Sequence, residues 1–322
     1  MISANRIEYN GYSSLDFNLI TDIAFDEDSG ETNTYLSKEA VASESYRGEF
    51  KRIHNFKYTE TLTPKFTFIK KDFSDFDITE VRKVLKWLTS PSNASFLSVY
   101  EDDSNVLDFE ILGGFTEVSL YKLGNGRTVG IVATFESAYP YALSPLKTIT
   151  KDISNPTDNT ITINIDTDEP ESAVYPRITI QQNSKENIIN INHPMTDADN
   201  WVVGSVFNYN QTYYWVDTDG VKRESNTNNS QLDTTSVSIR NTYTDNHGKT
   251  SAFDTLVKNN VKGEIVVLDG ANRVVSSSST RIFGDDFSWN WLPLYDGKNE
   301  LSFIGNCSVT IEYREPRKVG EY

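Results

Sequence analysis

The feature that most constrains the fold is a succession of short runs rich in β-branched and aromatic residues, each bounded by turn-forming residues. In the first half of the chain these runs cover residues 65–70, 96–100, 115–121 and 128–135. Runs of this kind are typical of strands. The sequence Gly124-Asn125-Gly126 separates the last two runs and supplies the positive φ angles of a tight reversal, so it predicts a hairpin. We expect a mainly β first half.

One segment, residues 77–89, has the pattern of an amphipathic helix. Asp77 and Glu80 have the spacing of a capping box, and Pro91 prevents continuation. The apolar residues at helical intervals are Val81, Val84, Leu85 and Leu88. We expect this face to pack on the sheet. Trp87 lies off it, between basic neighbours, and two interpretations stay open: a rim residue of the same core, or a contact for a partner.

Residues 26–49 are polar and weakly patterned, and we expect them to form a long extended loop that becomes ordered only against a neighbour. Farther along, Pro140, Pro145 and a turn cluster at 155–159 interrupt the strand pattern. We therefore expect two domains, residues 1–148 and 149–322. The length of 322 residues agrees, since single cores rarely grow beyond roughly 250–300 residues.

The second half again consists of strand-type runs, which predict an antiparallel sandwich. They cover residues 160–165, 177–180, 187–191, 202–207, 235–240, 263–268 and 307–313. A polar and aromatic stretch at about 196–260 is longer than a sandwich connection needs, and two interpretations stay open. It is an insertion that projects from the domain, or it supplies ordinary extra strands to the sandwich. Near its end, residues 251–257 have a short helical pattern.

Composition narrows the possible functions. The formal net charge is −16, and neither half of the chain offers the basic surface that tight binding of nucleic-acid phosphates requires. Cys307 is the only cysteine, which excludes an intramolecular disulfide and a cysteine-based zinc site. The apolar runs are far shorter than a spanning helix, and the first residues lack a signal-type apolar core. We expect a soluble chain.

Two acidic segments partly match known kinds of site, one a calcium-binding loop and the other a pair of catalytic carboxylates. Residues 217–220 match the middle of a calcium loop, but the residues at its first and twelfth places are not the Asp and Glu that calcium requires. Residues 166–171 hold a cluster of carboxylates, and a polysaccharide-degrading enzyme would depend on Asp166 or Asp168. A solvated turn explains this cluster better. We expect no enzymatic activity, no cofactor and no metal.

The candidate binding residues are aromatic. Sugars stack on aromatic faces while amides bond their hydroxyls, and an aromatic group set among Asn and Thr therefore suits a glycan or a protein partner. It consists of Trp201, Tyr209, Tyr213, Tyr214 and Trp215. The alternative, that Tyr213 and Trp215 face a core, stays equally open. Trp289 and Trp291 alternate as in a strand, and we interpret both as core residues on one face.

Three stretches, in this order, carry a family likeness. They are residues 86–91 with the acidic turn at 100–103, residues 132–142, and residues 292–303 running into 309–314, preceded by 267–272. Together they resemble the distal tail protein of long-tailed bacteriophages that infect Gram-positive bacteria. The resemblance implies a tail-tube-like split β-barrel with one α-helix in the N-terminal domain. It implies a galectin-like β-sandwich in the C-terminal domain.

The same resemblance implies a function. Six copies would form a ring, single or as two stacked rings, that joins the tail tube to the tip or baseplate. The implied partners are the tail tube protein, a tip or baseplate hub protein and a receptor-binding protein; cell-wall carbohydrate is a further candidate, and DNA crosses the lumen only as cargo. The implied location is the distal tail tip of the virion, after synthesis in the host bacterial cytoplasm. The alternative is a stand-alone carbohydrate-binding protein that uses the C-terminal sandwich.

Overall fold

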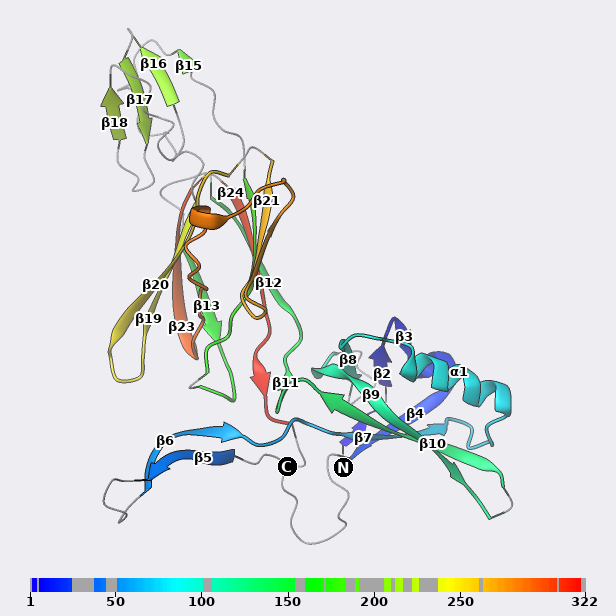
Figure 1. The fold of residues 1–322 in the computed structure, drawn as a ribbon. Coiled ribbons are helices and arrows are strands. Elements are labelled where there is room, and N and C mark those ends of the chain that lie inside the picture. The colour runs from blue at the N-terminus through cyan, green and yellow to red at the C-terminus, as the bar shows by residue number, and fades with distance from the viewer. Residues whose placement is uncertain are drawn as a thin grey trace. The chain divides into compact units, whose positions relative to one another are not determined.

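The computed structural model of the chain is mainly β, and its described part contains one α-helix (Figure 1). This confirms the predicted fold class. No described helix is long and apolar enough to cross a membrane. The structure describes residues 2–4, 6–24, 38–44, 51–100, 106–124, 126–153, 160–170, 172–182, 189–190, 206–209, 212–216, 222–225, 237–260, 263–305 and 307–319. The chain divides into two compact units: unit 1 is Met1–Pro145 with Pro316–Tyr322, and unit 2 is Leu146–Glu315.

Unit 1 is built on one large sheet. Its strands follow the spatial order β1-β4-β7-β10-β9-β8-β2-β3, with β11 and β25 beside this path. Their bounds are β1 (Ile2–Ala4), β2 (Arg6–Tyr9), β3 (Tyr12–Ser13), β4 (Leu19–Ala24), β7 (Lys65–Lys70), β8 (Ser95–Tyr100), β9 (Phe109–Lys122), β10 (Thr128–Ser137), β11 (Ala142–Leu143) and β25 (Pro316–Arg317). Because β25 pairs with β11, the sandwich unit ends before the last described residues of the chain. The predicted hairpin is confirmed as β9 and β10.

Helix α1 (Ile78–Thr89) begins as its sequence predicts. Asp77 accepts hydrogen bonds from the amides of Thr79 and Glu80, and the Glu80 carboxylate accepts one from the Asp77 amide. These bonds satisfy amides that a helix start leaves without an intrahelical partner. The capping box is therefore confirmed.

Trp87 completes the buried face of α1. Its side chain is only 3% exposed, whereas Leu85 is partly buried at the edge of the same core. The Trp87 ring stacks on Phe17 with ring centroids 4.8 Å apart, and its Nε1 donates a hydrogen bond to the Tyr9 carbonyl at 2.8 Å. Of the two interpretations of Trp87, the core position is correct.

Unit 2 contains a sandwich of two antiparallel sheets around a second core. The first sheet has the order β12-β24-β14-β21-β22 and the second β13-β23-β19-β20. The bounds are β12 (Lys147–Ile153), β13 (Thr160–Ile165), β14 (Arg177–Gln182), β19 (Val237–Thr244), β20 (Thr250–Val257), β21 (Ile265–Asp269), β22 (Val274–Ser277), β23 (Gly297–Ile304) and β24 (Cys307–Tyr313).

The end of the predicted insertion belongs to this sandwich. Val237 and Ile239 in β19 and Val257 in β20 are completely buried in its core. The helical pattern predicted for residues 251–257 is wrong, because β20 pairs with β19 along its whole length. Before β19, the described backbone forms a further sheet of four strands. These are β15 (Ile189–Asn190), β16 (Val206–Tyr209), β17 (Thr212–Val216) and β18 (Lys222–Ser225).

Candidate interaction surfaces

Strands β5 (Lys38–Glu44) and β6 (Lys51–Tyr58) form a two-stranded ribbon, which we call the arm. No other described strand pairs with it, and it extends away from the sheet of unit 1 (Figure 1). The expectation of a loop over residues 26–49 is therefore wrong for residues 38–44, which form β5. The pattern of these residues gives little sign of a strand, because no described residue of the same chain packs on the ribbon and its side chains do not alternate between a core and solvent.

The arm has two chemically different faces. Residues directly opposite each other in the ribbon share a face, so Ala40 lies with Phe56 and Ala42 with Ile53. A bulge between Val41 and Ala42 shifts the register, and this shift keeps the two large apolar residues of β6 on one side. Phe56 is 58% exposed and Ile53 is 53% exposed. The arm thus presents an uncovered apolar face.

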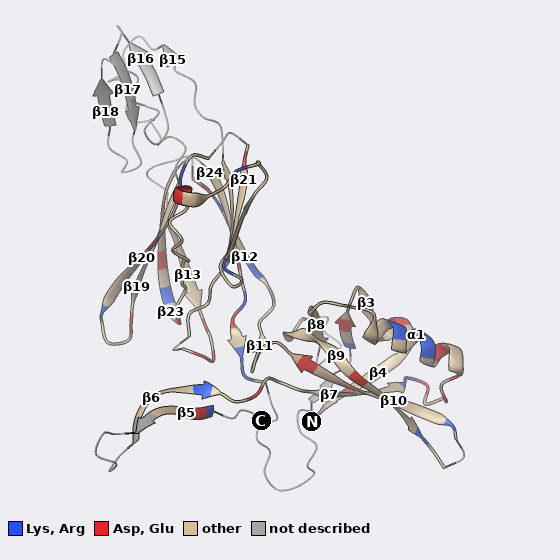
Figure 2. Cartoon of the chain, in the orientation of Figure 1, with Lys and Arg blue, Asp and Glu red and all other residues tan. Residues whose placement is uncertain are grey.

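The opposite face of the arm is more polar. Glu39 and Lys57 face each other there and form an ion pair at 2.7 Å, followed by Val41 opposite Asn55. At the base of the arm, Lys38 is opposite Tyr58 on the side of Ala40 and Phe56, and its ammonium lies 4.3 Å from the centre of the Tyr58 ring. Figure 2 shows both acidic and basic residues in the described part of the ribbon. The arm is therefore an amphipathic ribbon.

The hairpin of β9 and β10 adds a second uncovered surface. Strand β8 pairs with β9 only over residues 109–113, so residues 114–122 have a described strand neighbour on one side, which is β10. Beyond this segment lies the turn of the hairpin, which carries exposed Leu123. Tyr121 is exposed as well. An edge of this length can pair with another chain.

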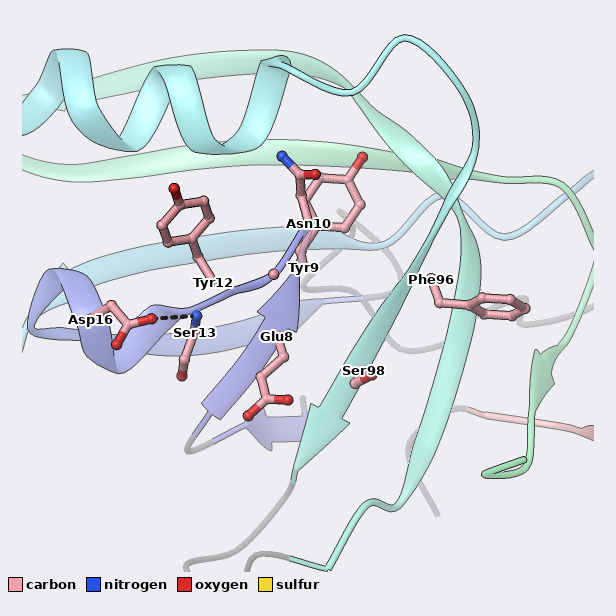
Figure 3. A pocket seen from close by; sticks show the side chains of 9 residues that line it. Glu8, Tyr9, Asn10, Tyr12, Ser13, Asp16, Phe96 and Ser98 are labelled. Carbon is pink, nitrogen blue, oxygen red and sulfur yellow. Dashed lines mark hydrogen bonds between the residues drawn. The ribbon is translucent and has the colours of Figure 1, made fainter. Parts of the chain in front are cut away.

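A depression in unit 1 lies beside the turn between β2 and β3 (Figure 3). Asn10 and Gly11 make this turn with φ angles of 50° and 75°, the geometry that an Asn-Gly hairpin favours. The depression is open and has a volume of about 410 Å³. Its lining residues are Glu8, Tyr9, Asn10, Gly11, Tyr12, Ser13, Asp16, Phe96 and Ser98.

The two carboxylates of this depression are held in place. Glu8 accepts a hydrogen bond from the Tyr100 hydroxyl at 3.1 Å and lies 3.4 Å from Arg6, while Asp16 accepts one from the Ser13 amide at 2.8 Å. Burial raises the pKa of Tyr100, Glu8 raises it further and Arg6 lowers it, so its hydroxyl remains a donor. The hydroxyl of Ser98 in the lining donates a hydrogen bond to the Glu110 carboxylate at 3.4 Å. The chemistry of the lining suits contact with a polar or cationic group of a partner.

The predicted aromatic site lies in the small sheet. Tyr209 ends β16, and Tyr213, Tyr214 and Trp215 follow one another in β17, with Tyr209 opposite Thr212 in the register. The structure describes the backbone of these strands and not their side chains, and Trp201 lies outside the described residues. The binding role of the group stays a prediction.

Of the two acidic segments, the structure describes the one that begins at Asp166, over residues 166–170. Residues 217–220 lie outside the described residues. In the segment at Asp166 the Glu169 amide donates a hydrogen bond to the Thr167 hydroxyl, as in a turn, and the Asp166 amide donates one to Glu315, which is distant along the chain. No group of three or more His, Cys, Asp or Glu among the described residues could hold a metal ion.

Two family models match the chain. One, described as a phage tail protein N-terminal domain, matches residues 2–138, and the other, described as a phage tail C-terminal domain, matches residues 217–313. The chain belongs to the phage tail proteins. Its C-terminal match begins within the small sheet and covers most of the sandwich.

A solved structure supports the same assignment for the fold. The tail protein is similar to the Dit protein of phage SPP1, which is described as a paradigm of the hub adsorption apparatus in phages that infect Gram-positive bacteria. The identity is 12%, the TM-score is 0.52, and the similarity covers 97% of the tail protein and 98% of Dit. No curated protein sequence matches the chain. The predicted family resemblance is confirmed.

Proposed function

We propose that the tail protein is a hub at the distal end of the phage tail and that six copies close a ring through unit 1. The uncovered apolar face of the arm carries this proposal. The fold shared with SPP1 Dit, a protein of a hub adsorption apparatus, supports the hub role. The ring joins the tail tube to the tip or baseplate, and it carries the components that recognise the host.

The arm needs a surface to lie on. A two-stranded ribbon is at best marginally stable by itself in water, and three strands or a packed face are needed for independent stability. The arm has neither among the described residues, and its face with Ile53 and Phe56 stays exposed. A second copy of the chain is the occupant that would be present at every arm. The exposed edge of β9 would be covered in the same assembly.

The geometry of such a contact leads to a ring. The arm of one copy would dock on a different surface of the next, which makes the contact heterologous. Heterologous contacts form a closed ring when the rotation closes, and every arm is then covered. The net charge of −16 agrees with a lumen for DNA, because a wall without basic adhesion sites lets a polyanion pass.

The remaining partners follow from the place of the ring. The hub would contact the tail tube protein on one side and a tip or baseplate hub protein on the other, in one ring or two stacked rings. A receptor-binding protein would dock at its periphery. The protein would be made in the cytoplasm of the host and act in the virion, at the distal tip of the tail.

Two variants of the arm test the ring. Light scattering coupled to size exclusion should give about 219 kDa for the wild type, six times the chain mass of 36.5 kDa, or twice that for stacked rings. Ile53→Ser with Phe56→Ser should reduce the mass to that of one chain while both units stay folded, because neither residue belongs to the core of unit 1. The matched control, Asn55→Ser with Lys57→Ser on the opposite face, should keep the ring.

The results distinguish a wrong contact at the arm from a wrong function. A ring in the Ile53 and Phe56 double variant would mean that the arm does not hold the copies together. A wild type that stays monomeric at high concentration would overturn the hub proposal. A monomer that binds glycans would instead support the stand-alone carbohydrate-binding protein.

A further inference from the structure

Trp289 is held out of the core of unit 2. In a regular strand, Phe287, Trp289 and Trp291 would share one face, as the sequence pattern predicts. Phe287 is buried and Trp291 packs partly buried against the core, but Trp289 is 54% exposed. Its φ angle is 58°, in the left-handed region, and this conformation breaks the alternation. The core interpretation is therefore right for Trp291 and wrong for Trp289.

Hydrogen bonds fix the segment that carries Trp289. Three of them join residues 286–290 to the end of the edge strand β20. They run from the Lys258 amide to the Asp286 carbonyl at 2.7 Å, from the Ser288 amide to the Leu256 carbonyl at 3.0 Å, and from the Thr255 hydroxyl to the Asn290 carbonyl at 2.8 Å. The indole Nε1 of Trp289 donates to the Gly284 carbonyl at 2.9 Å. This bond holds the indole beside Gly284.

The exposed position of Trp289 lowers the stability of the fold. A bulky residue at positive φ is an outlier, and such strain persists where the surroundings enforce it, often at ligand sites. Burying Trp289 would also remove apolar surface from water. The fold keeps the positive φ and leaves Trp289 exposed. The indole packs edge-on against buried Phe287, and the two ring centroids are 5.3 Å apart. This arrangement favours a surface that meets a ligand.

The chemistry around Trp289 indicates the kind of ligand. Ile282, which is 93% exposed, and the indole provide apolar surface, while Asp285 and Asn290 are exposed polar residues of the same loop. A pyranose ring offers the matching combination of an apolar C–H face and hydroxyl groups. The carboxylates of Asp285 and Asp286 disfavour anionic sugars.

We propose that residues 282–290, which we call the Trp289 loop, bind neutral saccharides. The indole stacks on the apolar face of a sugar ring, and Asp285 and Asn290 bond its hydroxyls. This site lies in unit 2 and includes no residue of the small sheet with Tyr213 to Trp215. It goes beyond the ring and does not depend on it, because all of its residues belong to unit 2.

The test uses the full-length protein and defined tetrasaccharides of glucose, galactose and N-acetylglucosamine as probes. Saturation-transfer NMR should show contact of at least one of them with the wild type, and calorimetry should give its affinity. Trp289→Ala should weaken binding by about tenfold or more, and Trp289→Phe should lose less, because a ring remains. The control is Phe73→Ala, an exposed aromatic residue of unit 1, which should bind as the wild type does.

Both negative results are informative. No contact of the wild type with any of the three probes would overturn the proposal. Equal affinity in Trp289→Ala and the wild type, with unit 2 folded by near-ultraviolet circular dichroism, would overturn it too. Ring formation is measured separately by the mass of the assembly, so failure here leaves the hub proposal standing.

Discussion

Replacing Trp87 by alanine should destabilise unit 1 and leave unit 2 unchanged. The side chain is almost completely buried, stacks on Phe17, meets Phe68 edge-on at 5.9 Å and donates a hydrogen bond to the Tyr9 carbonyl. Truncation of a buried aromatic residue of this kind costs about 3–5 kcal/mol. Trp87→Phe keeps most of the ring but leaves the carbonyl without this donor, which costs about 1–3 kcal/mol.

Hydrogen exchange measured by mass spectrometry reads the two units separately. The slowest amides of unit 1, in β7 and α1, should exchange about 100- to 4,000-fold faster in Trp87→Ala, since each 1.4 kcal/mol is a factor of ten. The amides of β24 in unit 2 serve as the internal control and should not change. Lys86→Ala, on the exposed face of the same helix, should leave both units unchanged. Exchange in Trp87→Ala within twofold of the wild type would refute the packing argument.

Two further predictions concern buried groups of unit 2. Burial, with a smaller effect of Asp152, raises the pKa of the Cys307 thiol to about 12, so at pH 8 the native thiol should resist alkylation until the chain unfolds. Stability should fall as the pH rises from about 9 to 12, because the unfolded thiol ionises while the buried one does not; rapid alkylation of the native protein would contradict this. Glu315 is completely buried, accepts the Lys147 ammonium at 2.7 and 2.8 Å, and accepts the Asp166 amide at 3.2 Å. Glu315→Ala should cost roughly 3 kcal/mol, because Lys147 is partly exposed, and unchanged exchange in β24 would contradict this.

The parts of the fold that the sequence predicts well are those in which local signals and packing agree. Asp77 and Glu80 mark the start of α1 because a capping box works within one turn. The turn with Gly124 and Gly126 marks the hairpin of β9 and β10, and Gly126 has the expected positive φ of 82°. The sequence does not decide whether Trp87 belongs to the core or contacts a partner. It lies beside lysines, and helical spacing alone does not show how far a large ring reaches into the core.

The parts that the sequence does not predict depend on contacts distant along the chain. Strand β20 has apolar residues Phe253, Leu256 and Val257 at helical spacing, but pairing with β19 decides its structure. Between them, Thr255 is buried, and its hydroxyl donates a hydrogen bond to the Asn290 carbonyl. No periodicity could reveal this partner.

The two surfaces on which the proposals rest were missed for different reasons. The arm packs on no core among the described residues of its own chain, so its strands lack the alternation that marks a strand against a core. Trp289 does alternate with its aromatic neighbours, and only its positive φ reverses the expected side. A signal for the arm was present in the sequence: Ile53 and Phe56 are large apolar residues in an otherwise polar stretch.

The central claim is that this tail protein closes a ring through its arm, and imaging of single particles tests it most directly. Electron microscopy of the purified full-length protein should show rings with six-fold symmetry, in which the face of each arm with Ile53 and Phe56 lies against the next copy. Particles of a single chain, or rings in which that face remains in solvent, would contradict the account.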